Sequence, residues 1–110
     1  MRILMLFMIC TVMAGCAQNS ISVLNDKIKD IKEAAEQGDV RAQTNLGIMY
    51  VNGEGVLQDD KQAVYWYRKA AEQGDARAQS NLGVMYANGE GVLHDDKQAV
   101  YWYRKAAEQG

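Results

Sequence analysis

The stretch that decides the fold is GDVRAQTNLGIMYVNGEGVLQDDKQAVYWYRKAAEQ, residues 38–73, followed directly by GDARAQSNLGVMYANGEGVLHDDKQAVYWYRKAAEQ, residues 74–109. The copies differ at five places, which are Val40/Ala76, Thr44/Ser80, Ile48/Val84, Val51/Ala87 and Gln58/His94. A fixed period of this length is typical of solenoids, in which each unit packs only on its neighbours. The sequence therefore predicts an all-α, α/α solenoid that contains two full units.

Each unit divides into a helix–turn–helix pair. In the first unit we expect helices over about residues 39–51 and 60–73, separated by the glycine-rich turn NGEG. Asp39 is a suitable N-cap for the first helix because it follows a glycine that can end the preceding helix. Asp59 and Gln62 have the spacing of a capping box, which predicts the start of the second helix.

Small residues indicate how the two helices pack. One face of each predicted helix is apolar: Ala42, Leu46, Gly47 and Tyr50 on the first, and Ala63, Tyr67 and Ala70 on the second. Glycine inside a helix costs about 1 kcal/mol relative to alanine. Its presence at 47 in one copy and at 83 in the other therefore predicts a close helix contact, with Tyr67 filling the space beside Gly47.

A leading half-repeat precedes the two units. From about residue 23, Leu24, Ile28 and Ile31 recur at helical spacing, and the segment ends in AAEQGD, as the first full unit does. Residues 23–37 are therefore predicted to form a degenerate second helix. Its abundant charged residues suit a terminal helix with one face in water.

The first residues, MRILMLFMICTVMAGC, have the pattern of a secretory signal. Met13-Ala14-Gly15-Cys16 resembles a bacterial lipobox, which predicts a signal peptide over 1–15, lipidation of Cys16 and a tether over 16–22. The alternative is an ordinary cleaved signal. The lipobox reading implies an exported protein anchored to the membrane by lipid only, and the Ala17 that follows implies the outer membrane, facing the periplasm. Because Cys10 leaves with the signal, no disulfide is expected.

Composition and motifs give no support for catalysis. The net charge of −2 does not predict a nucleic-acid-binding face. Gly53-Glu54-Gly55 lacks the remaining elements of a phosphate-binding loop and is interpreted as a turn. His94 has no second metal ligand at a useful spacing, and Asp59-Asp60 is better explained by helix capping than by acid–base chemistry. We expect no catalytic residues, metal or other cofactor.

The repeated positions resemble the Sel-one-like repeat family. The matching residues in the first unit are Ala42, Leu46, Gly47, Tyr50, Asn52, Gly53, Gly55, Val56, Asp59, Ala63, Trp66, Tyr67, Lys69, Ala70, Ala71 and Gly74, each with a partner one period later. The resemblance covers about residues 34–110. It implies a solenoid related to tetratricopeptide repeats that serves as a non-catalytic adaptor for other proteins.

Two alternatives to an adaptor follow from the same resemblance. Cysteine-rich members of the family have been associated with binding and hydrolysis of β-lactams. Those members carry a cysteine pair in each repeat, whereas the units here have none, and no Ser-x-x-Lys occurs in the chain. The other alternative is a shortened remnant of a longer array.

The differences between the copies suggest a partner surface. Four of the five changes, at 40, 44, 48 and 51, fall on one face of the first helix. We hypothesise that this face lines a groove that binds an unidentified protein; small residues drifting where packing is loose would be the alternative. The expected contact residues are Arg41, Thr44, Asn45, Ile48 and Asn52, with Arg77, Ser80, Asn81, Val84 and Asn88 in the second unit.

The last helix raises the prospect of a second interface. Lys97–Gln109 is identical to Lys61–Gln73, a segment that the following unit must cover. We therefore expect Trp102, Tyr103 and Ala106 to present an apolar end surface. It would dock on another chain, including a second copy of this one, unless the chain is a shortened array.

Overall fold

A computed structural model describes residues 20–109, and every regular element in this range is a helix. Residues 20–36 form a leading helix, followed by α2 (Val40–Asn52), α3 (Asp60–Glu72), α4 (Ala76–Asn88) and α5 (Asp96–Gln109). The predicted helix pairs are thus confirmed, with bounds within about one residue of those expected. The fold is an all-α solenoid.

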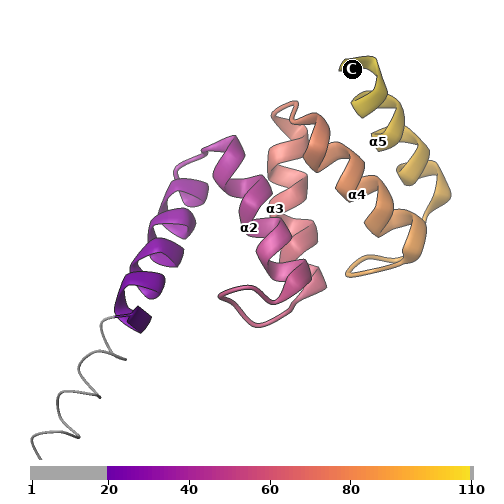
Figure 1. Cartoon of the computed structure of the whole chain (residues 1–110). Coiled ribbons are helices and arrows are strands. Elements are labelled where there is room, and N and C mark those ends of the chain that lie inside the picture. The colour runs from indigo at the N-terminus through magenta and orange to yellow at the C-terminus, as the bar shows by residue number, and fades with distance from the viewer. Residues whose placement is uncertain (1–19, 110) are drawn as a thin grey trace, which may run out of the picture.

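The helices follow one another in space as they do in sequence (Figure 1). α2 packs on α3, α3 on α4, and α4 on α5. The leading helix covers α2, since Ala35 lies in one buried cluster with Leu46 and Trp66, and Ile31 packs against that cluster. Each helix therefore obtains its apolar contacts mainly from its neighbours in the array.

Aspartates begin the helices at equivalent places. Asp39 Oδ1 accepts a hydrogen bond from the Ala42 amide at 2.9 Å, and Asp75 Oδ1 accepts from the Ala78 amide at 2.8 Å. Asp59 Oδ1 accepts from the amide of Gln62 at 3.2 Å. The predicted capping box is only half formed, because the Asp59 amide donates instead to the Tyr50 carbonyl at 2.9 Å. That bond closes the turn between α2 and α3.

The joint between the repeats is a Schellman motif. The Asp75 amide donates to the Ala70 carbonyl at 3.1 Å, and the Gly74 amide donates to the Ala71 carbonyl at 3.0 Å. Gly74 has φ 99°, a conformation that a side chain would strain. The leading helix ends in the same way, with Gly38 at φ 100°. The leading helix and α3 therefore both lead into the following unit through the same turn.

A ladder of glutamines ties neighbouring elements together. Gln43 is buried, and its Nε2 donates to the Ala35 carbonyl at 3.0 Å. Its Oε1 accepts from Gln73 Nε2 at 2.7 Å. Gln79 is also buried and makes the same two bonds one unit later, to the Ala71 carbonyl and from Gln109. Gln43 on α2 therefore joins the C-terminal end of the leading helix to that of α3. Gln79 on α4 joins the C-terminal ends of α3 and α5 in the same way.

The close contact predicted at Gly47 is confirmed. A Cβ added there would lie 2.6 Å from Tyr67 Cδ1, so only glycine lets the ring approach α2. Gly83 and Tyr103 repeat the contact, with 2.8 Å to Tyr103 Cε1. The predicted packing faces are also confirmed, because Leu46, Ala63 and the other residues of these faces are buried or half-buried.

The leading helix extends further toward the N-terminus than the sequence predicts. Residues 20–22, which the sequence analysis placed in the tether, are already helical. Leu24 falls in phase with Ile28 and Ile31, but Ile21, Val23 and Leu24 are exposed. Ile28 lies against Gly55 in the turn between α2 and α3, and Asn25 lines a hollow beside the same glycine.

Candidate functional site

One hollow lies where the starts of the two units meet. It encloses about 230 Å³ and is lined by Arg41, Thr44, Asn45, Asp75 and Arg77. Four of these five residues belong to the predicted partner surface: Arg41, Thr44 and Asn45 lie on α2, and Arg77 lies on α4 at the position equivalent to Arg41. The structure therefore brings together part of the predicted set in one concave place.

Two arginines give this hollow its charge. Arg41 and Arg77 occupy the same position in successive repeats, and both side chains are exposed. Asp75 supplies one carboxylate, but its Oδ1 already accepts the amide of Ala78. The hollow therefore offers two guanidinium groups to a ligand with acidic or amide oxygens.

The second arginine also acts on a buried tyrosine. Burial raises the pKa of Tyr67 above its usual value of 10.0. The positive charge of Arg77 and a side-chain hydrogen bond with Asn81 partly offset that rise in pKa. Asn81 is half-buried at this contact, whereas Asn45 is exposed, and the residue of the leading helix equivalent to Tyr67 is Ile31. The two asparagines are therefore not equivalent, and Asn81 has a structural role.

The face that varies between the units is not an open groove wall, contrary to the sequence-based hypothesis. Thr44 is only 3% exposed, and its hydroxyl donates to the Val40 carbonyl. The main core of the solenoid is the buried cluster that contains Val64, Tyr67 and Leu82. It is contacted by Val40, Ile48 and Val51. On α4, which no described repeat follows, the corresponding residues are more open: Ser80 is half-buried and Val84 is exposed.

Asn52 and Asn88 lie apart from the hollow. Both are exposed at the C-terminal ends of their helices, where their amides donate to Glu54 and Glu90. They contribute to the turns and do not line the hollow at Arg41 and Arg77.

At the end of the solenoid, one predicted contact residue is wrong. Trp102 is 7% exposed and belongs to the main core, because it packs back on the preceding helices as Trp66 does. Tyr103 is 40% exposed as predicted, and Ala106 is half-buried. Val100, which is 52% exposed, was not among the residues predicted for this surface. Its equivalence to Val64, three residues before Tyr67, is the signal that would have found it.

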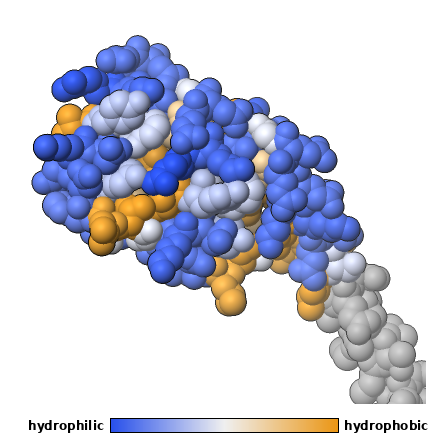
Figure 2. All heavy atoms as spheres, turned by 180° about the vertical axis from the view of Figure 1, so that it is seen from behind, coloured by the Kyte–Doolittle hydropathy of each residue, from blue (hydrophilic) through white to orange (hydrophobic). Residues whose placement is uncertain are grey.

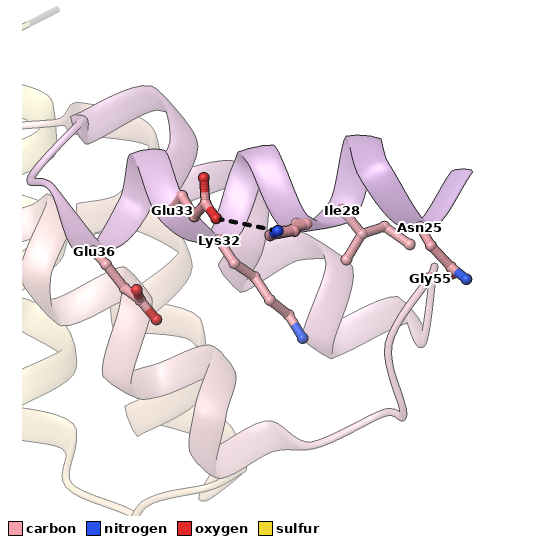
Figure 3. A pocket seen from close by; sticks show the side chains of 7 residues that line it. Asn25, Ile28, Lys32, Glu33, Glu36 and Gly55 are labelled. Carbon is pink, nitrogen blue, oxygen red and sulfur yellow. Dashed lines mark ion pairs between the residues drawn. The ribbon is translucent and has the colours of Figure 1, made fainter. Parts of the chain in front are cut away.

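Two surface features were not foreseen in the sequence. Leu57 and Leu93, at the same place in the two turns, are 90% and 91% exposed. Seen from behind, the surface is mainly hydrophilic with separate hydrophobic patches (Figure 2). A further hollow lies between the leading helix and the first turn, lined by Asn25, Ile28, Lys29, Lys32, Glu33, Glu36 and Gly55 (Figure 3). Lys29 and Glu33 form an exposed ion pair of 3.9 Å there.

The residues considered as candidates for acid–base chemistry or metal binding make hydrogen bonds within the turns and at the starts of the helices. Asp59 and Asp95 cap α3 and α5 through the amides of the following residues. His94 Nε2 lies 2.8 Å from Asp96 Oδ1 on the surface, as Gln58 lies beside Asp60 in the other unit. Within residues 20–109 no cluster of three metal-ligating side chains occurs.

No helix in this range is both long and apolar enough to cross a bilayer. Cys16 and the signal segment lie outside the described residues.

Comparison with solved structures shows three similar repeat proteins. A protective antigen of uropathogenic Escherichia coli strains, which displays an SLR fold, is 53% identical, with TM-score 0.77 over 79% of this chain and 19% of its own. A Sel1 repeat protein from Oxalobacter formigenes is 44% identical, with TM-score 0.74 over 76% of this chain and 63% of its own. Cysteine rich protein B of Helicobacter pylori is 31% identical, with TM-score 0.72 over 76% and 62%.

The chain spans less than two thirds of the length of each of these proteins. A comparison with curated protein sequences gave no significant match. The model of the Sel1 repeat matches residues 40–75 and 76–110, the two units that the structure describes as helix pairs. This repeat builds a solenoid for protein interaction and is generally a non-catalytic scaffold. The chain belongs to the Sel1 repeat family.

Proposed function

We propose that this protein is a non-catalytic interaction module of the bacterial cell envelope that binds a protein partner through the hollow between Arg41 and Arg77. The observation that carries the proposal is the pair of exposed arginines from equivalent positions, which flank one concave surface. Arginine binds carboxylates through paired, charge-assisted hydrogen bonds. The partner is therefore a protein segment with acidic side chains, and no nucleic acid or cofactor takes part.

The two arginines are tested by neutralising them together. The double variant Arg41→Gln/Arg77→Gln is compared with Lys27→Gln/Lys61→Gln, which removes the same charge from exposed positions outside the hollow. Each protein serves as bait in affinity capture from envelope extract, after circular dichroism has confirmed equal helix content. We expect the native protein and the lysine control to retain a common partner that the arginine variant loses. Equal capture by all three would refute the assignment of the hollow.

Asn45 is the better asparagine for a companion variant. Asn81 hydrogen-bonds with Tyr67, so its replacement also alters the contact between the repeats. Asn45→Ala removes only an exposed amide at the hollow. We expect it to weaken capture without lowering the melting temperature.

We further propose that Cys16 is lipidated and holds the module on the outer membrane, facing the periplasm. The lipobox-like Met13-Ala14-Gly15-Cys16 supports this location, and the similar E. coli protein is a protective antigen. Cys16→Ser should move the protein from the membrane fraction to the soluble fraction, and the mass of the native protein should show acyl chains. A native protein found soluble and without acyl chains would contradict the anchor.

A further inference from the structure

Each of the two glycine-rich turns carries one leucine that faces solvent almost entirely. Leu57 is 90% exposed and Leu93 is 91% exposed, at the same place in the two units. The residues before them, Val56 and Val92, are half-buried, so each turn directs its valine inward and its leucine outward. The turn of Leu57 lies within the array, with described helices before and after it. The exposure of this leucine therefore does not arise from an end of the chain.

Backbone hydrogen bonds fix both turns. The Asp59 amide donates to the Tyr50 carbonyl at 2.9 Å, and the Asp95 amide donates to the Tyr86 carbonyl at 3.0 Å. A side chain that is held in place before contact loses less entropy when it binds. The two leucines are therefore prepared for contact by the turns that carry them.

The turns lie at the same edge of the solenoid as the start of the leading helix. Gly55 in the first turn lies against Ile28 of the leading helix, and Gly91 in the second turn lies against the Asp60 carbonyl at the start of α3. Asp60 is the repeat counterpart of Leu24. Figure 1 shows both turns and the start of the leading helix on the lower side of the molecule, and several hydrophobic patches in Figure 2 lie along that side. We call this side the turn edge, defined by residues 20–24, 53–57 and 89–93.

The turn edge gathers exposed aliphatic side chains. Besides the two leucines it holds Ile21, Val23 and Leu24, which are 59%, 62% and 55% exposed. Within residues 20–109, the other large aliphatic side chains that are exposed are Val84 and Val100, which lie on helices. Apolar groups gathered on one surface mark contact with a protein or a membrane.

The lipid anchor proposed above places the turn edge beside a bilayer. Three residues separate Cys16 from Ser20, the first described residue of the leading helix. A fully extended chain advances at most about 3.6 Å per residue, so Ser20 lies within about 15 Å of Cys16. Acyl chains on Cys16 hold that residue at the lipid surface. The inference below rests on this anchor and does not rest on the hollow at Arg41 and Arg77.

Charge decides which kind of lipid surface fits the turn edge. The turns and the helix starts beside them hold more carboxylates than cations. The carboxylates are those of Glu54, Asp59, Asp60, Glu90, Asp95 and Asp96, and the cations are Lys61 and Lys97. An anionic bilayer repels such an edge, whereas zwitterionic headgroups do not. The same excess of negative charge opposes the pairing of two turn edges from two copies of the chain.

We propose that the turn edge rests on the zwitterionic lipid surface of the membrane that holds the anchor, with Leu57 and Leu93 inserted among the headgroups. Leucine side chains enter the boundary between headgroups and acyl chains. The hollow then faces away from the bilayer, because Arg41 and Arg77 lie in the first turns of α2 and α4, at the opposite ends of these helices. A helix of 13 residues is about 20 Å long. A partner therefore reaches the hollow from the aqueous side.

The position of the turn edge is measured with a fluorescent NBD label on the acylated full chain. Because Cys10 leaves with the signal and Cys16 is acylated, an introduced cysteine is the one free thiol. Glu54→Cys and Glu90→Cys place the label on the turns and keep both leucines. Glu72→Cys, at the exposed C-terminal end of α3 on the opposite edge, is the matched control. Each protein is reconstituted into phosphatidylcholine vesicles that contain lipids with a nitroxide on the acyl chain, which quenches nearby NBD.

We expect the nitroxide lipids to quench the labels of Glu54→Cys and Glu90→Cys and to leave that of Glu72→Cys unquenched. In the background Leu57→Ser/Leu93→Ser, quenching at both turns should fall toward the level of the control. Both leucines are exposed, and circular dichroism confirms that this variant remains folded. Addition of the anionic lipid phosphatidylglycerol should also reduce the quenching, because the turn edge is acidic.

The mass of each protein separates the inference from the anchor on which it rests. Labels on the two turns that stay unquenched, or that are quenched no more than the control, would refute the orientation alone when the mass shows acyl chains. Unchanged quenching in the background Leu57→Ser/Leu93→Ser would refute the insertion of the leucines. Shielding of the turn labels only after envelope proteins are added would identify a protein as the occupant. A mass without acyl chains would refute the anchor, and the orientation with it.

Discussion

Gly47 and Gly83 hold the same position in nearly identical repeats, but their tyrosine neighbours differ in freedom. Tyr67 is enclosed by α4, whereas Tyr103 is 40% exposed and can move away from an added methyl group. Overpacking of a closed core typically costs about 1–3 kcal/mol. We expect Gly47→Ala to lower the free energy of unfolding by an amount in that range. Gly83→Ala should be close to neutral, because alanine also gains about 1 kcal/mol of helix propensity.

Urea unfolding of both glycine variants measures this difference. Each variant is compared with the native protein under the same conditions. If the two substitutions lowered the unfolding free energy equally, the freedom of Tyr103 would not be the deciding factor.

The raised pKa of Tyr67 predicts that the protein loses stability at alkaline pH. Burial raises its pKa in the folded protein above the usual 10.0, so the unfolded chain ionises first as the pH rises. Its contribution is therefore fully present below pH 10 and is lost as the pH climbs through the raised folded pKa. Urea unfolding at pH 8, 10 and 11 should show this decline. Tyr67→Phe should decline less steeply, and an unchanged slope would contradict the role of Tyr67.

Residues with an internal partner were easier to predict than residues whose surroundings depend on the array. The contact between Gly47 and Tyr67 and the capping by the aspartates follow from local pattern, because both partners of each contact lie within one unit. Thr44 and Trp102 were misjudged because helical spacing gives the side of a helix but not what lies against it. Burial at these positions depends on neighbouring units, which a single period does not reveal.

At the scale of elements, the hydrogen bonds of the glutamine ladder should contribute to the stability of the packing between neighbouring helices. Replacing Gln79 by methionine keeps the length of the side chain but leaves the Ala71 carbonyl and the Gln109 amide without their buried partner. An unsatisfied buried polar group costs about 1–3 kcal/mol. We expect Gln79→Met to lower the unfolding free energy by that amount, measured in urea. Gln98→Met, at an exposed position of α5, serves as the control and should have little effect.

The ladder also shows why the sequence could predict the helices but not their connection. Gln43 stands between apolar positions and reads as an ordinary surface residue. Its partners are eight and thirty residues away, at Ala35 and Gln73. Contacts at these separations depend on how neighbouring helices pack against each other, which the local sequence pattern does not give. The capping aspartates involve neighbours within three residues and were therefore found.

At the scale of the molecule, the exposed face of α5 predicts that a further unit would stabilise the array. A third unit with the sequence of residues 74–109, joined after Gly110, should cover Val100 as α4 covers Val64. Full burial of a side chain of this size contributes about 1.5–3 kcal/mol. Val100 is 52% exposed and Tyr103 is 40% exposed, so covering both gains roughly the burial of one such side chain, and we expect the unfolding free energy to rise by about 2 kcal/mol. In the control, the added unit carries aspartate in place of the leucine equivalent to Leu82, and equal melting temperatures of the two proteins would refute the prediction.

The Schellman joint at Gly38 and Gly74 has a consequence for inheritance. Because the first unit begins and ends in the same turn, at Gly38 and Gly74, its gene segment can be duplicated in frame without creating a junction that the protein has not already used. The near identity of the two copies is what a recent duplication would leave behind. Natural variants of this gene in related strains should therefore differ by whole units more readily than by part of one.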